Sequence, residues 1–287
     1  MSKLKKLAYV LMVLVVIGFS AGCIENGSHA SSSPTGVQSY SPTSSSKSAG
    51  QIKKYSLDEF LNNLEKIKRF SYRENTSTVL NLTLTTGNLT QSRNVTVIYR
   101  RVRYVDLADR KADINTTTIT FPSGVSTFTR DIIVGKDVYV FLGARWLKLT
   151  NETLGISLGA LLNMTWKYNI VSFAGRYLQR KPFKEAFENG TQFLYYNITE
   201  EDLTAIAKAF IGNSNMTFNV TKGVLELRFR NGVLVGGRMG YRISVHIRGE
   251  NLGKRVDVYE IGHVYDEFII FDINVKKPVK VPQSYVS

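Results

Sequence analysis

The chain has 287 residues, of which 43% are hydrophobic and 21% charged, and its formal net charge is +14 at pH 7. This length and apolar content are enough for a sizeable core, which excludes a wholly disordered chain. Arginines and lysines are scattered along the sequence instead of forming one basic patch, so we expect no nucleic-acid partner.

Residues 1–22 predict an export signal. Lysines precede an almost unbroken apolar run from Leu7 to Phe19, and small residues separate that run from Cys23. The ending Ser20-Ala21-Gly22-Cys23 resembles a lipobox, which implies that Cys23 is lipidated and the preceding segment removed. The alternative is an uncleaved membrane anchor. Both interpretations attach the chain to the cell membrane and place its bulk on the extracellular side.

Residues 23–50 predict a disordered stalk, and residues 51–287 a single folded domain. Of the 21 residues from Ser28 to Ser48, 12 are Ser or Thr, and such a stretch buries too little apolar surface to fold. Cys23 is the only cysteine, so the exported domain has no disulfide and no cysteine nucleophile. Its stability must come from a hydrophobic core.

The first element of the domain is a predicted helix over Tyr55–Phe70. Ser56 and Glu59 have the spacing of a capping box, and Tyr55 and Phe60 that of a hydrophobic staple. Apolar residues then recur at helical spacing, which predicts that one side of this helix packs on other structure.

Strands follow the helix. Alternation of apolar and polar residues predicts strands around residues 80–85 and 94–99, but the pattern slips by one at Arg100-Arg101, which predicts a β-bulge. A strand over Ile114–Phe121 then leads to the clearest hairpin of the sequence, over Asp131–Thr150.

The second half of the domain begins with helices. Two apolar segments have helical lengths, a short turn follows Pro182, and Thr199 would cap a further helix. The glycines of residues 236–240 predict a hairpin turn between two strands. The helices are expected at 154–162, 166–178 and 200–211, the short turn at 183–187, and strands at 225–229, 241–247, 256–261 and 268–275.

Potential N-glycosylation sites are unusually dense. Twelve of the 19 asparagines begin an Asn-X-Ser/Thr triplet, about four times the number expected by chance. Polar surface positions on strands explain part of this excess, and glycosylation of several sites explains the rest, which suggests an archaeal cell surface. Besides Asn26 in the stalk, the candidates are Asn75, Asn81, Asn88, Asn94, Asn115, Asn151, Asn163, Asn189, Asn197, Asn215 and Asn219.

Residues that could carry catalysis are sparse. The three histidines, His29, His246 and His263, show no metal-ligand spacing, and no nucleophile motif is present. We therefore expect no enzyme, no metal and no cofactor.

The order of the elements resembles that of the LolA-like and LppX/LprG-like lipoproteins over residues 51–283. The resemblance rests on the capped first helix, on the segment Ile132–Val140 followed by Trp146–Leu149, and on the ending Val275–Pro282. It implies an α+β fold, in which helices cover the open side of a strongly curved antiparallel β-sheet, an incomplete barrel, over an apolar cavity for lipid acyl chains. The residues alone allow either a filled core or a cavity between such a sheet and its helices.

Two functions remain open. The first is a membrane-tethered extracellular lipoprotein that binds a hydrophobic or lipid ligand in an apolar cavity. The second is a structural or adhesive surface module with a packed core and no small ligand. The candidate lining residues of the cavity are Leu80, Leu82, Leu84, Val95, Val97, Tyr99, Tyr139, Trp146, Leu225, Leu227, Phe229, Ile243 and Val245.

Overall fold

The computed structural model describes residues 53–150, 158–203, 216–251 and 254–286. Within these segments the strands form one 11-stranded antiparallel sheet that does not close, with β6 and β7 at its two edges. Its strands are β1 (Arg69–Thr86), β2 (Leu89–Asp106), β3 (Lys111–Phe121), β4 (Val125–Val134), β5 (Asp137–Leu142), β6 (Arg145–Lys148), β7 (Lys184–Glu188), β8 (Thr191–Ile198), β9 (Met216–Arg230), β10 (Val233–Asn251) and β11 (Lys254–Phe271).

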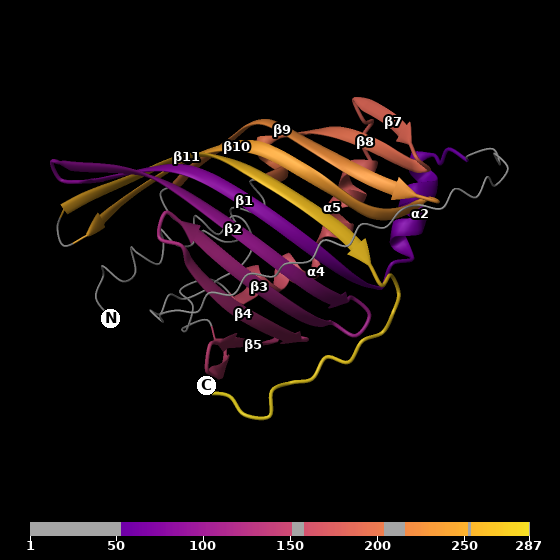
Figure 1. The fold of residues 1–287 in the computed structure, drawn as a ribbon, viewed down its shortest axis with the longest axis horizontal. Coiled ribbons are helices and arrows are strands. Elements are labelled where there is room, and N and C mark those ends of the chain that lie inside the picture. Colours follow the sequence, from indigo (N-terminus) through magenta and orange to yellow (C-terminus); the bar gives the residue numbers. More distant parts are fainter. Residues whose placement is uncertain (1–52, 151–157, 204–215, 252–253, 287) are drawn as a thin grey trace, which may run out of the picture.

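The sheet consists of two meanders joined at its centre. The strand order is β6-β5-β4-β3-β2-β1-β11-β10-β9-β8-β7, so the first strand pairs with the last. The central strands β1, β2, β10 and β11 have 18 or 19 residues each and form a curved layer (Figure 1). The pairing of 16 residues of β1 with 16 residues of β11 holds the two halves in one sheet.

Among the described residues, the helices that lie wholly within them are α2 (Leu57–Glu65) before β1, and α4 (Leu158–Trp166) and α5 (Ile170–Leu178) between β6 and β7. Helix α2 is shorter than the helix predicted over residues 55–70, because Lys66 caps its C-terminus and the chain enters β1 at Arg69. Residues 200–203 are helical after Thr199, and the rest of that predicted helix lies outside the described residues. No helix in the described segments is long and apolar enough to cross a membrane.

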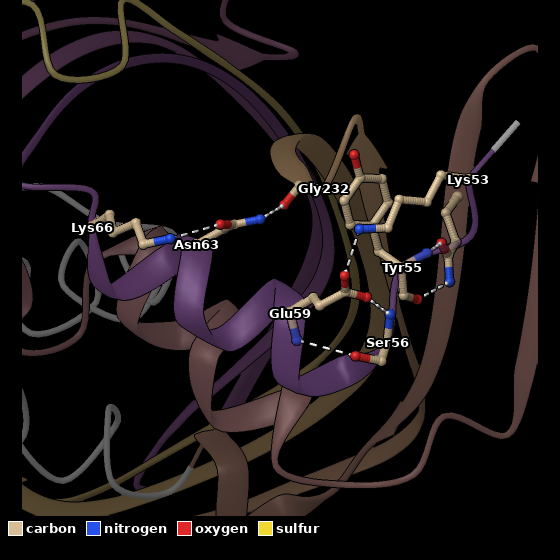
Figure 2. Close-up of polar contacts among 8 residues, drawn as sticks. Lys53, Tyr55, Ser56, Glu59, Asn63, Lys66 and Gly232 are labelled. Carbon is tan, nitrogen blue, oxygen red and sulfur yellow. Dashed lines mark hydrogen bonds and ion pairs between the residues drawn. The ribbon is translucent and has the colours of Figure 1, made fainter.

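The capping box of α2 is confirmed. The Ser56 hydroxyl accepts a hydrogen bond from the Glu59 amide at 3.2 Å, and the Glu59 carboxylate accepts one from the Ser56 amide at 2.8 Å (Figure 2). The Asn63 amide group donates to the Gly232 carbonyl at 3.0 Å, which ties the helix to the turn between β9 and β10. The Phe60 ring lies 4.0 Å from that of Phe229 of β9. These contacts fix α2 on one face of the sheet.

We call the face that carries Phe229 the inner face and the opposite face the outer face. Alternation and register place residues 72, 74, 76, 78, 80 and 82 of β1 on the inner face, and all six are buried. Helix α5 packs on the same face, where the rings of Tyr177 and Tyr196 are 5.5 Å apart. The main hydrophobic core therefore lies between the inner face and the helices.

The predicted bulge at Arg100-Arg101 is wrong. Strand β2 pairs with β1 residue by residue along its whole length without a register shift. Arg101 and Arg103 continue the inner parity and are buried, whereas Val102 is on the outer face and is 43% exposed. The change in the sequence pattern therefore reflects charged residues inside the fold and no change in backbone register.

Two predicted turns are also wrong. The segment 183–187 forms most of β7, and a turn at Asn189-Gly190, both at positive φ, pairs it with β8. Residues 236–240 lie within β10, and the turn before them is at Asn231-Gly232, again with both φ positive. An Asn-Gly pair suits the two left-handed positions of a tight hairpin. Register shifts between β9 and β10 occur on either side of the glycines.

The hairpin predicted over residues 131–150 is confirmed, with its strands in β4, β5 and β6. The edge strand β6 is itself covered by the C-terminal segment. The Lys148 amide donates to the Val286 carbonyl, and the Val286 amide donates to the Trp146 carbonyl, each at 2.9 Å. The last residues of the chain thus pair with this edge of the sheet.

Gly237 marks a close approach between β10 and its neighbours. A Cβ atom there would lie 2.7 Å from Cζ of Phe268 and still nearer to the Glu226 carbonyl oxygen. We expect Gly237→Ala to lower the free energy of unfolding by about 1–3 kcal/mol, as for other overpacked cores. Urea unfolding followed by circular dichroism measures this change.

Gly175 in α5 is the matched control, because a Cβ atom added there meets nothing within 4 Å. Gly175→Ala should leave stability unchanged or raise it by up to about 1 kcal/mol through helix propensity. Equal midpoints for the two variants would contradict the packing described at Gly237.

Candidate functional site

The inner face carries a group of buried charges at the centre of the sheet. We call Glu74 of β1, Arg101 and Arg103 of β2, Asp131 of β4 and Asp266 of β11 the charged cluster. Register brings its members together, because Glu74 pairs directly with Arg101 across β1 and β2. All five residues are at most 9% exposed.

Glu74 is the centre of the charged cluster. Its Oε2 atom lies 2.9 Å from Nη2 of Arg103 and 3.3 Å from Nη1 of Arg101, so the two guanidinium groups share one carboxylate oxygen. The guanidinium groups also lie over aromatic rings, Arg101 at 4.5 Å from the Tyr99 centroid and Arg103 at 5.4 Å from that of Tyr72. Buried ion pairs often contribute no net stability relative to apolar residues of the same size. Their presence in this core therefore suggests a role other than packing.

The ionisation of the carboxyl groups differs within the charged cluster. Burial opposes the charge of Glu74, but the attraction of Arg103 and Arg101 still leaves its pKa below the ordinary value. Burial, together with the charge of Glu74, raises the pKa of Asp266 to about 8, although Asp266 accepts a 2.7 Å hydrogen bond from the Thr76 hydroxyl. Burial also raises the pKa of Asp131 to about 7. At pH 7 Asp266 is therefore mostly protonated, whereas Asp131 is about half ionised.

A cavity of about 40 Å³ lies between the charged cluster and the helices. That volume holds a few water molecules or one small polar group. It is far below the roughly 300–1,000 Å³ of sites that hold drug-sized ligands. The sheet wall is largely polar and the helix wall largely apolar. The lining residues are Tyr72, Glu74, Arg103, Met239, Tyr241, Asp266 and Phe268 of the sheet, with Met164, Tyr168, Asn169, Ile170, Phe173 and Leu203 opposite.

A larger groove lies on the other side of α5. Its volume is about 620 Å³, and it is lined by α2, α5 and the turn after β2. Leu61, Leu64 and Val171 contribute apolar surface, and Lys68 and Arg176 contribute charge. Helix α5 therefore separates two hollows, with Ile170 and Phe173 towards the cavity and Val171 towards the groove.

Most of the predicted lining residues lie on the inner face, but none borders the cavity. Leu80, Leu82, Leu225, Leu227, Phe229, Ile243 and Val245 belong to the main core, and Leu84 packs against it. Val95, Val97 and Tyr99 form a separate buried cluster on β2. Whether any of these residues contacts a ligand stays a prediction.

Tyr139 and Trp146 lie on the outer face, which corrects their assignment as lining residues. In β5 the inner positions are Val138 and Val140, as their pairing with β4 shows, so Tyr139 points outward. Its ring packs against Tyr285 of the C-terminal segment at 5.0 Å. Trp146 pairs with Phe141 on the same outer face.

The predicted glycosylation sites are accessible wherever the structure describes them. Asn75, Asn81, Asn88, Asn94, Asn163, Asn189, Asn197 and Asn219 are exposed, and Asn115 is partly exposed. Asn26, Asn151, Asn215 and the predicted lipidation site Cys23 lie outside the described residues. Glycosylation and lipidation stay predictions.

The sequence analysis missed the charged cluster. The sequence pattern at Arg100-Arg101 was interpreted as a β-bulge, although the alternation Val95, Val97, Tyr99 continues directly onto Arg101 and Arg103. Following that parity would have placed them inside. Among the described residues, no group of three or more His, Asp or Glu side chains is arranged to hold a metal ion.

Comparison with known proteins assigns this chain to no family. No family model matches the sequence, and no curated protein matches it. Among solved structures, LprF from Mycobacterium bovis is similar with a TM-score of 0.35 and 10% identity, covering 81% of this chain and 95% of LprF. A DUF1329 family protein from Desulfovibrio piger has a TM-score of 0.24 and 11% identity, with coverages of 77% and 93%. Similarities of this size support neither a fold assignment nor a function.

Asp266 provides a test of the buried charges through the pH dependence of stability. The pKa of Asp266 in the folded state, about 8, is above the ordinary value of 3.8. The contribution of Asp266 to the free energy of unfolding is therefore fully present below pH 4 and is lost as the pH rises through 8. The wild type should therefore lose stability between pH 5 and pH 8. Asp266→Asn should remove roughly 2–4 kcal/mol of that loss, at about 1.36 kcal/mol per pH unit.

The measurement is the free energy of unfolding in urea at pH 5, 6.5 and 8. Asp58→Asn, at an exposed position in the first turn of α2, is the control and should leave the pH dependence unchanged. An Asp266→Asn protein with the wild-type pH dependence would show that Asp266 is ionised in the folded state.

Proposed function

We propose that this chain is a membrane-tethered extracellular lipoprotein that binds a hydrophobic or lipid ligand between the inner face of its sheet and its helices. The observation that carries the proposal is the incomplete packing of α5, which has a cavity on one side and a groove of about 620 Å³ on the other. The groove has the volume of a typical ligand site. A helix that only completed a core would be packed against protein on its buried side.

Binding in this proposal requires movement of the helices. The interior cavity of about 40 Å³ is too small for an acyl chain, so α4 and α5 must shift away from the inner face. The sheet can remain in place, because its strands are held by continuous backbone pairing. The helices then act as a movable cover of the open side. Each methylene group of a ligand buried beneath them contributes about 0.8 kcal/mol.

The tether and the cell-surface location follow from the sequence. A lipidated Cys23 and a Ser/Thr-rich stalk would hold the domain near the outer side of the membrane. Exposed Asn-X-Ser/Thr triplets on both halves of the sheet are consistent with a glycosylated surface. The sequence resemblance to LolA-like lipoproteins implies the same class of binding protein, with no enzymatic activity.

The second candidate is a structural or adhesive module with a packed core. It is favoured by the extent of the buried apolar cluster, which already includes most of the predicted lining residues. In that case the hollows beside α5 stay empty of ligand. The two candidates differ in whether a hydrophobic molecule purifies with the protein.

The test uses a Cys23→Ser chain, whose recovered lipid cannot come from a thiol-linked anchor. Mass spectrometry of organic extracts should detect a hydrophobic molecule in near-equimolar amount. Met164→Trp should reduce its recovery several-fold, because Met164 of α4 lines the cavity. Val79→Trp is the matched control, because Val79 is exposed on the outer face of β1. This variant should leave the recovery of the hydrophobic molecule unchanged. Repeated recovery of no such molecule would favour the packed module.

A further inference from the structure

We infer that the ligand carries a hydrogen-bond-donating group, a hydroxyl or an ammonium, and that Glu260 of β11 binds this group on the apolar part of the inner face. This inference rests on the proposed function and names the ligand class for the same face of the sheet. Three observations support it: the burial of Glu260, the lack of a partner for its carboxyl group, and the apolar side chains around it.

Glu260 is a buried carboxyl group without a partner. The residue is 0% exposed, and within the described part of the chain neither of its carboxyl oxygens accepts a hydrogen bond. Burial alone raises the pKa of Glu260 to about 7, which agrees with the absence of an ion pair to any described residue. A polar group buried in this way lowers the stability of the fold. A donor from outside the chain would supply the missing partner.

The neighbours of Glu260 are apolar. Register pairs it with Leu82 of β1 on one side and with Val245 of β10 on the other, and both neighbours belong to the main core. Ile243, two residues from Val245, continues the apolar surface on the inner face of β10. Arg93 of β2 has the same inner parity, but it is exposed and Leu82 lies between it and Glu260. One polar position is therefore set into an apolar surface.

Other buried carboxyl groups of the described residues have donors or positive charges beside them. Glu226 accepts a hydrogen bond from Arg228 at 2.7 Å. Asp106 accepts one from Arg69 at 2.8 Å. The three carboxyl groups of the charged cluster interact with its two arginines. Glu260 differs from all of these, so its burial is not explained by an internal ion pair.

A mostly apolar molecule with one donor group fits this surface. Its hydrocarbon part would contact Leu82 and Val245, and its hydroxyl or ammonium group would donate to the Glu260 carboxyl. Hydrogen bonds that involve an ionised group are stronger than neutral ones. A pure hydrocarbon would leave the carboxyl group unpaired, and a carboxylate or phosphate would bring a second negative charge towards it.

Glu260 lies beyond the cavity along β11. It is six residues from Asp266, which lines the cavity, so about 20 Å of strand separates the two at roughly 3.3 Å per residue. Even spacing in a strand places both side chains on the inner face. Because Glu260 is fully buried, the atoms that cover it must move before a ligand reaches it. The proposed function already requires such movement above the inner face.

The test measures binding of three twelve-carbon probes to the delipidated Cys23→Ser chain by displacement of an uncharged fluorescent dye at pH 7. Dodecanol and dodecylamine carry the two donor groups. Dodecyl methyl ether has the same chain and an oxygen atom but cannot donate. We expect at least one of the two donors to bind about ten times more tightly than the ether. The stronger donor then identifies the group as a hydroxyl or an ammonium.

Glu260→Met should abolish this preference while ether binding stays within about threefold of the wild type, because methionine has a similar length and no carboxyl group. Glu188→Met is the matched control, since Glu188 is exposed on the edge strand β7, and it should keep the wild-type preference. Glu260→Gln still accepts hydrogen bonds but has no charge. It should therefore keep a preference for the alcohol and lose a preference for the amine.

A second measurement needs no ligand. Glu260→Met should unfold at a higher urea concentration than the wild type at pH 7, because an apolar side chain replaces an unpaired carboxyl group. Circular dichroism follows the transition. A lower urea midpoint for Glu260→Met would show that the carboxyl group has a stabilising partner inside the fold, which would overturn the inference.

The outcomes separate the two levels of the proposal. Binding of none of the three probes would overturn the proposed function together with this inference. Equal binding of all three probes, or a donor preference that persists in Glu260→Met, would leave the function standing and overturn the role of Glu260.

Discussion

The fold depends on the pairing of its first strand with its last. The paired residues of β1 and β11 are 170 to 200 positions apart in sequence, from Thr86 with Val256 to Ser71 with Phe271, and their alignment converts two separate meanders into a single sheet. The same alignment sets Thr76 beside Asp266 and completes the charged cluster, whose other members come from the first meander. Loop-closure entropy opposes a pairing of this sequence separation until other contacts form. The central seam of the sheet is therefore also the place where the candidate site is assembled.

Local sequence signals predicted the parts of the fold that depend on nearby residues. The capping box at Ser56 and Glu59 works through contacts three residues apart, and the hairpin over 131–150 through direct strand pairing. Both were predictable because their partners are close in the chain. The Asn-Gly pairs at 189–190 and 231–232 were equally local, but the first was interpreted only as a glycosylation triplet and the second was displaced by the glycines that follow it. Those two turns were missed because the first pair was assigned to a glycosylation triplet and the turn was placed at the glycines after the second pair.

The candidate site was harder to predict because it depends on residues far apart in the sequence. Arg101 and Arg103 make an inner-facing strand look like a change of register when only their own strand is considered. Their partner Glu74 lies on the neighbouring strand, and Asp266 lies beyond it on the last strand. Apolar side chains alone were expected in the interior, since unpaired charges are rarely buried there. The buried charges could be predicted only from the order and register of the strands, which place them next to one another.

The pairing of Val286 with β6 affects how neighbouring copies of this protein meet. An exposed sheet edge is a template on which a strand of another chain can add, and repetition of that event leads to polymerisation. Here the chain occupies one of its two edges with its own last residues. The opposite edge, β7, has only five residues and carries Lys184, Glu185 and Glu188, a short charged strand of the kind that resists such growth. A high local concentration of this protein then does not join its sheets edge to edge.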